Sequence, residues 1–166
     1  DLKDMETGLL VTLLYGVFPK KDVITRAVRL QNEGQELLTL ESVQSASLDL
    51  IYGDYDWIQF YGRHAMERNV QRIPAAHGAH VIGSRRGTSS HQYNPFVILA
   101  EKETTEDFGA CYGMSFVYSG GFQAFAERDQ YDQTRMGMGI SPEGFSWSLK
   151  PGESFTAPEV ILSYTG

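Results

Sequence analysis

The sequence predicts an all-β fold, an antiparallel β-sandwich, on three observations. Short runs of alternating apolar and polar residues recur along the chain, as half-buried strands require. Turn signals rich in Gly, Asn, Asp and Pro separate these runs about every eight to twelve residues, which is typical of sandwiches and barrels. The 166 residues, 42% hydrophobic and 12% aromatic, suffice for one sizeable core, so we expect a single domain over residues 1–166.

The chain is expected to begin with a hairpin. Residues 8–18 alternate, and after a break at Pro19-Lys20-Lys21-Asp22 the alternation resumes over residues 23–30. Asn32-Glu33-Gly34 is a turn signal, because Asn and Gly tolerate a positive φ. A further strand is expected over residues 37–50, where the Glu and Leu content leaves a helix as the alternative.

The rest of the chain supplies more short strands. Residues 55–61 form an aromatic strand, and Gly62 is expected to separate it from the next one. The turn Ser119-Gly120-Gly121 is expected to close a hairpin. The other strands are expected at residues 65–73, 80–86, 96–100, 111–118, 122–129, 134–140, 145–149 and 160–164, with Phe155 in a further short one.

The formal net charge of −7 is unevenly distributed and disfavours nucleic-acid binding. Residues 61–94 carry five arginines against the single acid Glu67, about +4, and hold all four histidines, whereas the remainder carries about −11. We expect this basic segment to face acidic surface. Charge balance within the domain and a dedicated ligand site are both open interpretations.

The chain has one cysteine, Cys111, which excludes an internal disulfide framework and fits a reducing, cytoplasmic compartment. We expect Cys111 to be a small buried apolar residue. The sequence contains no run of about twenty apolar residues, so no membrane partner is expected. No signal-peptide pattern is visible near Asp1.

The sequence offers no catalytic or metal-binding motif. It lacks a Gly-rich phosphate loop, a Cys-x-x-Cys pair and histidines at helical metal-ligand spacing. His77 and His80 are expected to be exposed loop residues. The neighbouring carboxylates Asp54 and Asp56, like Glu106-Asp107, are expected to be turn formers, because glycoside hydrolysis needs two carboxylates facing each other across a sugar.

The densest polar stretch is residues 85–96, which read Arg-Arg-Gly-Thr-Ser-Ser-His-Gln-Tyr-Asn-Pro-Phe. Donors, acceptors and a flat aromatic ring in one loop are the groups that a sugar-binding surface uses. The same groups also suit a structural loop that satisfies its own backbone, with Arg86 clamping a carboxylate. The candidate contact residues are Arg86, Ser90, His91, Gln92 and Asn94.

This stretch resembles a segment of the family 36 glycoside hydrolases, the bacterial and fungal α-galactosidases. Further similar motifs follow in the family's order and cover nearly the whole chain. They are residues 22–26 with Leu30-Gln31-Asn32, residues 45–49, Gly53-Asp54-Tyr55, Tyr112-Gly113, residues 116–119 with Gly121-Phe122, residues 145–147 with Leu149, residues 151–155, Pro158-Glu159 and Tyr164.

The resemblance implies a place within a multidomain enzyme that hydrolyses terminal α-galactosides such as melibiose and raffinose. In that family an N-terminal β-supersandwich, related to the galactose mutarotase-like fold, precedes a catalytic (β/α)₈ barrel. This chain resembles the later and larger part of that sandwich, and we expect it to be a fragment of the longer protein. The resemblance implies a homo-tetramer and no metal or organic cofactor.

The resemblance transfers no catalytic residue to this chain. The family's two catalytic aspartates lie in barrel motifs, which match nothing here. The five candidates named above are therefore expected to contact the barrel or a partner subunit.

Two other functions stay open from the residues alone. A free-standing carbohydrate-binding module would use Trp57, Tyr61 and Trp147 as a stacking platform, although aromatic residues at strand spacing are more often core. A mutarotase-like epimerase would need a histidine and a carboxylate converging in an open cleft.

Overall fold

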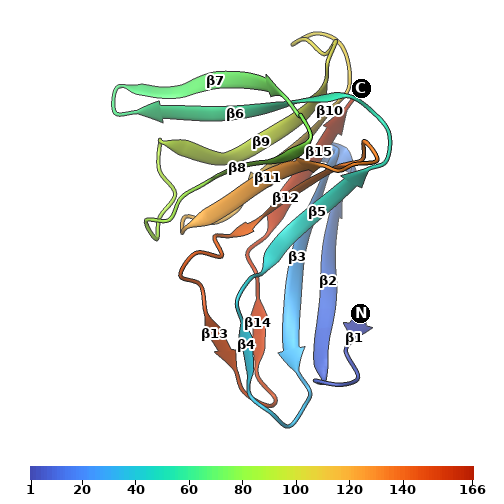
Figure 1. Cartoon of the computed structure of the whole chain (residues 1–166), viewed down its shortest axis with the longest axis vertical. Helices are drawn as coiled ribbons and strands as arrows, with labels where there is room; N and C mark the ends of the chain where they lie inside the picture. The colour runs from blue at the N-terminus through green and yellow to red at the C-terminus, as the bar shows by residue number, and fades with distance from the viewer.

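A computed structural model describes all 166 residues as β-strands joined by turns, with one 3₁₀ turn at Pro19–Lys21 and no α-helix (Figure 1). The largest sheet has nine strands, all paired antiparallel. Its order is β1 (Leu2–Lys3), β2 (Leu9–Phe18), β3 (Val23–Asn32), β15 (Val160–Thr165), β10 (Cys111–Phe116), β9 (Tyr93–Glu101), β6 (Tyr55–Arg63) and β7 (Met66–Pro74), with β14 (Ser154–Thr156) beside β3.

A second layer covers part of this sheet. It contains β11 (Phe122–Arg128), β12 (Thr134–Ile140) and β5 (Gln44–Leu50), and β8 (Gly78–Gly83) runs alongside β11 (Figure 1). A two-stranded sheet of β4 (Leu38–Leu40) and β13 (Trp147–Leu149) lies below. The predicted sandwich is thus confirmed, and the structure contains no helix with the length and hydropathy that crossing a membrane requires.

The main core lies between the large sheet and the β11–β12–β5 layer. Strand alternation sends every second side chain of each layer into this space. Trp57, Leu99 and Met114 enter from the large sheet and meet Phe122 and Met136 from the opposite layer, all essentially without solvent exposure. Burying each such side chain stabilises the fold by about 1.5–3 kcal/mol, so this core dominates stability.

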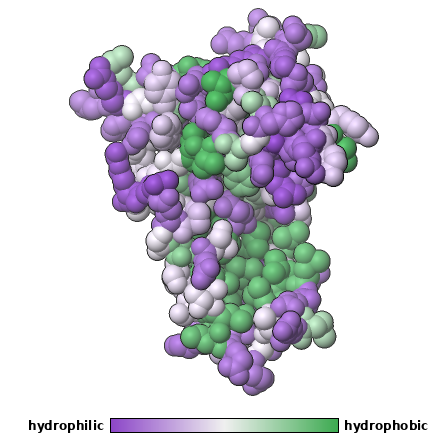
Figure 2. Space-filling view, viewed as in Figure 1, coloured by the Kyte–Doolittle hydropathy of each residue, from purple (hydrophilic) through white to green (hydrophobic).

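A smaller cluster lies between β3 and the β4–β13 sheet. Val28 and Leu30 of β3 contact Leu40 and Leu149 from the two short strands. Figure 2 shows hydrophobic side chains gathered on this lower part of the molecule, where β2 and β3 run. The second cluster is therefore only partly covered.

Asn32 is the polar centre of this smaller cluster. It is fully buried, and its Nδ2 donates to the carbonyl oxygens of Glu36 and Leu149, both at 2.8 Å. Its Oδ1 accepts the Gly34 N–H at 2.9 Å. The turn predicted at residues 32–34 is thus tied to β13, far away in the sequence.

The expectation of one strand over residues 37–50 is wrong, and so is its helical alternative. The segment divides into β4 and β5, which enter different sheets. Leu40 and Val43 pack in the smaller cluster, whereas Ala46 packs in the main core. The chain must pass from one core to the other, and this passage breaks the strand.

Two turn predictions also need correction. Gly62 does not end its strand, because β6 continues to Arg63 and the hairpin to β7 turns at His64 and Ala65, where Ala65 has a φ of 63°. The Ser119-Gly120-Gly121 turn closes no hairpin. It carries the chain from β10 to β11 in the other layer, because β10 is already paired on both edges, by β9 and β15.

The N-terminal hairpin is confirmed. β2 and β3 pair antiparallel along their full length, from Leu9 opposite Asn32 to Phe18 opposite Val23. The short 3₁₀ turn and the left-handed Asp22, with a φ of 50°, reverse the chain between them.

Candidate functional site

The polar stretch singled out in the sequence forms the loop between β8 and β9, residues 84–92. Inside the loop, Ser84 Oγ donates to the carbonyl oxygen of Thr88 at 2.5 Å. Outside it, the Ser89 N–H donates to the carbonyl oxygen of Ser119 at 2.8 Å, which ties the loop to the β10–β11 crossover. The loop is held in one shape by these bonds, as the structural interpretation of its sequence requires.

The five candidate residues do not converge on one point. Arg86, His91 and Gln92 are exposed, whereas Ser90 and Asn94 are half-buried. Ser90 Oγ accepts the backbone N–H of Gln92 at 3.2 Å, so it shapes the loop. Four of the candidates thus lie in a structured loop, and Asn94 lies in β9.

The expectation that Arg86 clamps a carboxylate is wrong. Its neighbour Arg85 does so instead, with an Nη2 to Oε1 distance of 2.6 Å to Glu143. Both of these side chains are at least half exposed, so the ion pair contributes little stability. Arg86 has no carboxylate partner within the chain.

Asn94 is unusual among the candidates. Its Oδ1 is buried but accepts no hydrogen bond from any group of this chain. Buried carbonyl oxygens are nearly always paired, so this atom calls for a buried water molecule. The next residue of β9 on the same face, Phe96, stacks on Phe60 with ring centroids 5.4 Å apart.

A shallow cavity of about 400 Å³ adjoins the loop. Arg85, Arg86 and Gln92 line it from the loop side, and Gln123 and Glu143 line it from the other layer. Ser90, His91 and Asn94 do not reach it. Guanidinium and amide groups at its rim suit hydrogen bonding to an acidic or hydroxyl-rich surface.

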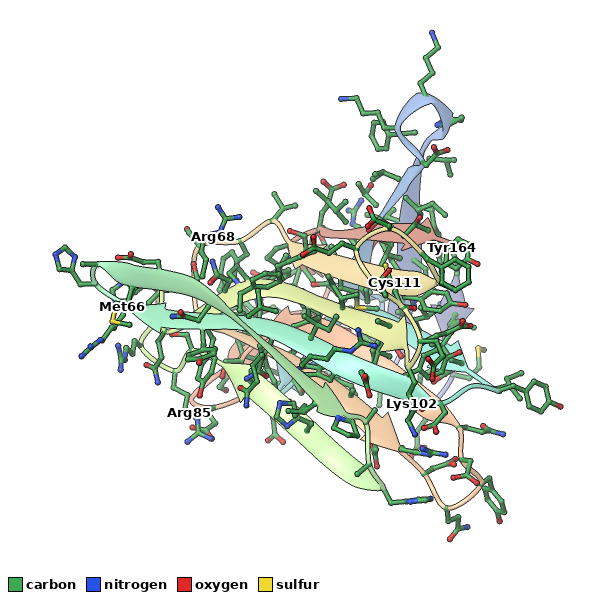
Figure 3. The ribbon with its side chains drawn as sticks, turned by 90° about the horizontal axis from the view of Figure 1, so that it is seen from above. Met66, Arg68, Arg85, Lys102, Cys111 and Tyr164 are labelled. Carbon is green, nitrogen blue, oxygen red and sulfur yellow. The ribbon has the colours of Figure 1, made fainter.

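The basic residues gather at one end of the molecule, called here the basic end and defined by Arg63, Arg68, Arg85 and Arg86. Figure 3 shows Arg68 and Arg85 at this end together with Met66, opposite Lys102, Cys111 and Tyr164. The fifth arginine of the segment, Arg72, is instead bound to Asp56 at 2.7 Å and to three backbone carbonyls. Of the five arginines in residues 61–94, only Arg72 and Arg85 are therefore paired with a carboxylate of this chain.

The neighbouring carboxylates form no acid–base pair. Asp54 is bound by Lys102 and by Arg128, and the hydrogen bond from Lys102 is the main reason that the pKa of Asp54 is lowered. Asp56 is held by Arg72. No three His, Cys, Asp or Glu side chains gather where they could hold a metal ion.

The expectation of two exposed histidines is correct for the exposure of His77 but wrong for His80. His77 is exposed and lies 3.1 Å from Asp132, but His80 is half-buried in β8 with its ring 5.6 Å from that of Trp57. His80 Nε2 is 2.9 Å from Gln59 Oε1, an acceptor, so this nitrogen carries the hydrogen. Burial lowers the pKa of His80.

A comparison with known proteins identifies the chain. A profile described as the "Glycosyl hydrolase family 36 N-terminal domain" matches residues 1–150. The chain belongs to this family. The family 36 N-terminal domain is 57% identical over 164 residues to the "Bifunctional alpha-galactosidase/sucrose kinase AgaSK" of Mediterraneibacter gnavus, covering 99% of this chain and 18% of that protein. It is 48% identical to "Alpha-galactosidase AgaA" of Geobacillus stearothermophilus, covering 22% of that protein.

Solved structures agree with this assignment. The galactosidase domain of AgaSK superposes with a TM-score of 0.96 over 98% of this chain and 22% of that chain. A Geobacillus stearothermophilus AgaA structure gives 0.96 at 47% identity over 98% of this chain and 23% of that chain. A candidate aldose 1-epimerase of Escherichia coli, 15% identical with a TM-score of 0.54, shows the mutarotase-like fold alone. The family 36 domain spans about a fifth of the α-galactosidases that it matches.

The aromatic residues of the family 36 domain do not form a sugar-stacking platform. Trp57 is fully buried in the main core, whereas Tyr61 and Trp147 are partly exposed on β6 and β13, which belong to different sheets. Trp147 packs against Phe155, with ring centroids 5.2 Å apart. The three rings therefore lie at separate places in the domain.

Sequence reasoning missed a buried polar network in the family 36 domain. Gln59 Oε1 accepts from Trp57 Nε1 at 2.8 Å and from His80, and Gln59 Nε2 donates to Gln71 Oε1 at 2.8 Å. The sequence did contain a sign of this network. Gln59 follows Trp57 by two residues on a strand, so both side chains point to the same inward face, and a buried amide there needs hydrogen-bond partners.

Proposed function

We propose that residues 1–166 are a single, non-catalytic β-sandwich domain of a longer polypeptide that hydrolyses terminal α-galactosides such as melibiose and raffinose. The observation that carries this proposal is the identity of 57% and 48% to two proteins named as α-galactosidases, over nearly the whole chain. The lone cysteine supports a cytoplasmic location for that polypeptide.

The chemistry would lie outside these residues. Retaining glycoside hydrolysis needs two carboxyl groups about 5–5.5 Å apart, one as nucleophile and one as acid and base. Here Asp54 and Asp56 are each bound by basic side chains and therefore unsuited to either role. We assign catalysis to a (β/α)₈ barrel of the same polypeptide, acting by double displacement without a cofactor.

This function predicts a clear difference between two proteins. The longer polypeptide is expected to hydrolyse p-nitrophenyl α-galactoside and melibiose, and the 166-residue chain is expected to hydrolyse neither. Proton NMR of the first product should show the α-anomer of galactose, because double displacement retains configuration. p-Nitrophenyl β-galactoside is the matched control substrate. Hydrolysis by the 166-residue chain alone, or first formation of the β-anomer, would contradict the proposal.

We further propose that the 84–92 loop and the basic end contact the barrel or a neighbouring subunit of a homo-tetramer. One feature supports this role: Arg63, Arg68 and Arg86 have no carboxylate partner in the chain. An acidic partner surface would supply these partners.

Replacing His91 and Asn94 by alanine in the longer polypeptide tests this contact. We expect a loss of about tenfold or more in kcat/KM, or dissociation of the tetramer, because leaving a buried polar group of the contact unpaired costs about 1–3 kcal/mol. Light scattering and steady-state kinetics measure the two effects. His91 is exposed, so His91→Ala alone tests the contact without disturbing the fold. His77→Ala is the control, because His77 is exposed and pairs with Arg128, whose partner Asp54 also binds Lys102, at the end opposite the basic end (Figure 3). Unchanged activity and unchanged tetramer would refute the contact.

A further inference from the structure

The cavity beside the 84–92 loop has an apolar base and polar walls. Ile82 and Phe122, which are buried in the main core, form the base. The walls come from the loop, from the start of β11 and from the residues that follow β12. Figure 3 shows Arg85 of the loop reaching outward at the edge of the domain. The volume of about 400 Å³ falls within the range of small-molecule sites, about 300–1,000 Å³.

Ser141 contributes an unpaired hydroxyl group to this cavity. The residue lines the cavity, yet it is only 8% exposed. Its backbone N–H donates to the carbonyl oxygen of Gly121 at 3.1 Å, whereas no group of this chain forms a hydrogen bond with its Oγ. Buried hydroxyl groups normally have a partner, so the Ser141 hydroxyl is poised to bond a polar group that enters the cavity.

Three other polar side chains around the cavity also form no hydrogen bond within the chain. They are the amides of Gln92 and Gln123 and the hydroxyl of Tyr93, and the last two residues are half-buried. Amide and hydroxyl groups can both donate and accept hydrogen bonds. Together with Ser141, these groups surround one space with unused donors and acceptors.

The charged side chains at the mouth favour a neutral ligand over an acidic one. Arg85 is already paired with Glu143 at 2.6 Å. A carboxylate that entered the cavity would meet Glu143 as a like charge, and only Arg86 would remain to attract it. A sugar suits both signs of charge, because its hydroxyl groups donate to a carboxylate and accept from a guanidinium or an amide.

Hydrogen bonds fix the walls of the cavity relative to one another. The Ser84 N–H donates to the carbonyl oxygen of Phe122 at 2.9 Å, which joins the start of the loop to β11. Ser84 Oγ holds Thr88 within the loop, and the bond between Ser141 and Gly121 joins the third wall to the β10–β11 crossover. A site that already has its shape loses little conformational entropy when a ligand binds.

We propose that this cavity binds a hexose unit of a neutral oligosaccharide. The amides of Gln92 and Gln123 and the hydroxyl of Ser141 would bond the sugar hydroxyl groups, and Glu143 would accept from one of them. The C–H face of the sugar ring would pack on the apolar base. The domain would then hold carbohydrate by itself, in addition to its proposed role as a non-catalytic part of a longer polypeptide.

The sugar site and the proposed protein contact depend on different residues of the loop. Ser90, His91 and Asn94 do not reach the cavity, so they stay free for the contact. Arg86 is the one residue that belongs to both the cavity and the basic end. The inference requires no catalytic residue, and it therefore stands or falls separately from the proposed function.

Amide hydrogen exchange of the longer polypeptide, titrated with galactose and separately with sucrose, tests the site segment by segment. We expect sugar to slow exchange in residues 85–92, and the more effective of the two sugars identifies the hexose. Gln123→Ala is expected to raise the sugar concentration for half-maximal slowing about tenfold, because a hydrogen bond to the sugar is lost. Gln92→Ala, in the exposed part of the loop, should raise it without disturbing the fold. Gln133→Ala, exposed between β11 and β12 and outside the cavity, is the matched control and should leave it unchanged.

Three results would overturn the proposal. Exchange that neither sugar slows would show that the cavity takes no hexose. The same sugar dependence in the two cavity variants and in the control would show that the slowing arises from sugar bound elsewhere. Slowing by hexaglutamate, and by neither sugar, would assign the cavity to an acidic protein surface. Because the readout is hydrogen exchange, a longer polypeptide that lacks α-galactosidase activity would contradict the proposed function while leaving this test valid.

Discussion

Trp57→Ala is expected to lower the free energy of unfolding by about 3–5 kcal/mol, the largest loss from any single truncation in this domain. Trp57 has no solvent exposure and lies at the centre of the main core. Its removal leaves a cavity that the rigid sheets on either side cannot close. It also removes the Nε1 donor of Gln59, a residue that holds His80 in place.

Thermal and urea unfolding of Trp57→Ala measure this loss, which corresponds to a Tm about 10 °C lower. Trp147→Ala is the matched control, because Trp147 is 48% exposed and contacts mainly Phe155. We expect the control to cost about 1 kcal/mol. Similar losses for the two tryptophans would contradict the assignment of Trp57 to the core.

Asn32→Ala is expected to cost about 3 kcal/mol or more, although it removes only a small side chain. Three backbone groups lose their partner together, namely the carbonyls of Glu36 and Leu149 and the N–H of Gly34. The bond to Leu149 is buried and the other two are partly buried, and each unpaired buried group costs about 1–3 kcal/mol. Because Leu149 belongs to β13, the loss should loosen the contact between β3 and the β4–β13 sheet.

Chemical denaturation and amide hydrogen exchange of residues 38–40 and 147–149 measure this effect. Asn32→Asp separates hydrogen bonding from shape, because its carboxylate would face two carbonyl oxygens at the same volume. At neutral pH we expect it to be at least as unstable as the alanine variant. Asn69→Ala, in the β6–β7 hairpin, is the control and should cost about 1 kcal/mol or less. A stable Asn32→Asp protein would contradict this role for the amide.

Local pattern predicted the strands well where one face was buried and one solvated. The β2–β3 hairpin and the strands β11 and β12 followed from alternation and turn residues alone. The residue pattern gave wrong predictions where a segment could join more than one sheet. Residues 37–50 have the pattern of one strand, but their side chains are divided between two separate cores. The Ser119–Gly121 turn has the pattern of a hairpin, but β10 has no free edge with which the next strand could pair.

The candidate site likewise combines features that the sequence predicts with features that depend on the tertiary structure. The sequence by itself determined the all-β class, the absence of a catalytic motif and the ordered motifs that resemble the family, because these depend on residue type and order along the chain. Only the tertiary structure decided which arginines are paired, that Asn94 Oδ1 is unpartnered, and that β5 lies at the edge of its sheet. Ion pairs, burial and sheet edges are set by residues far apart in sequence, and these contacts exist only once the layers have packed.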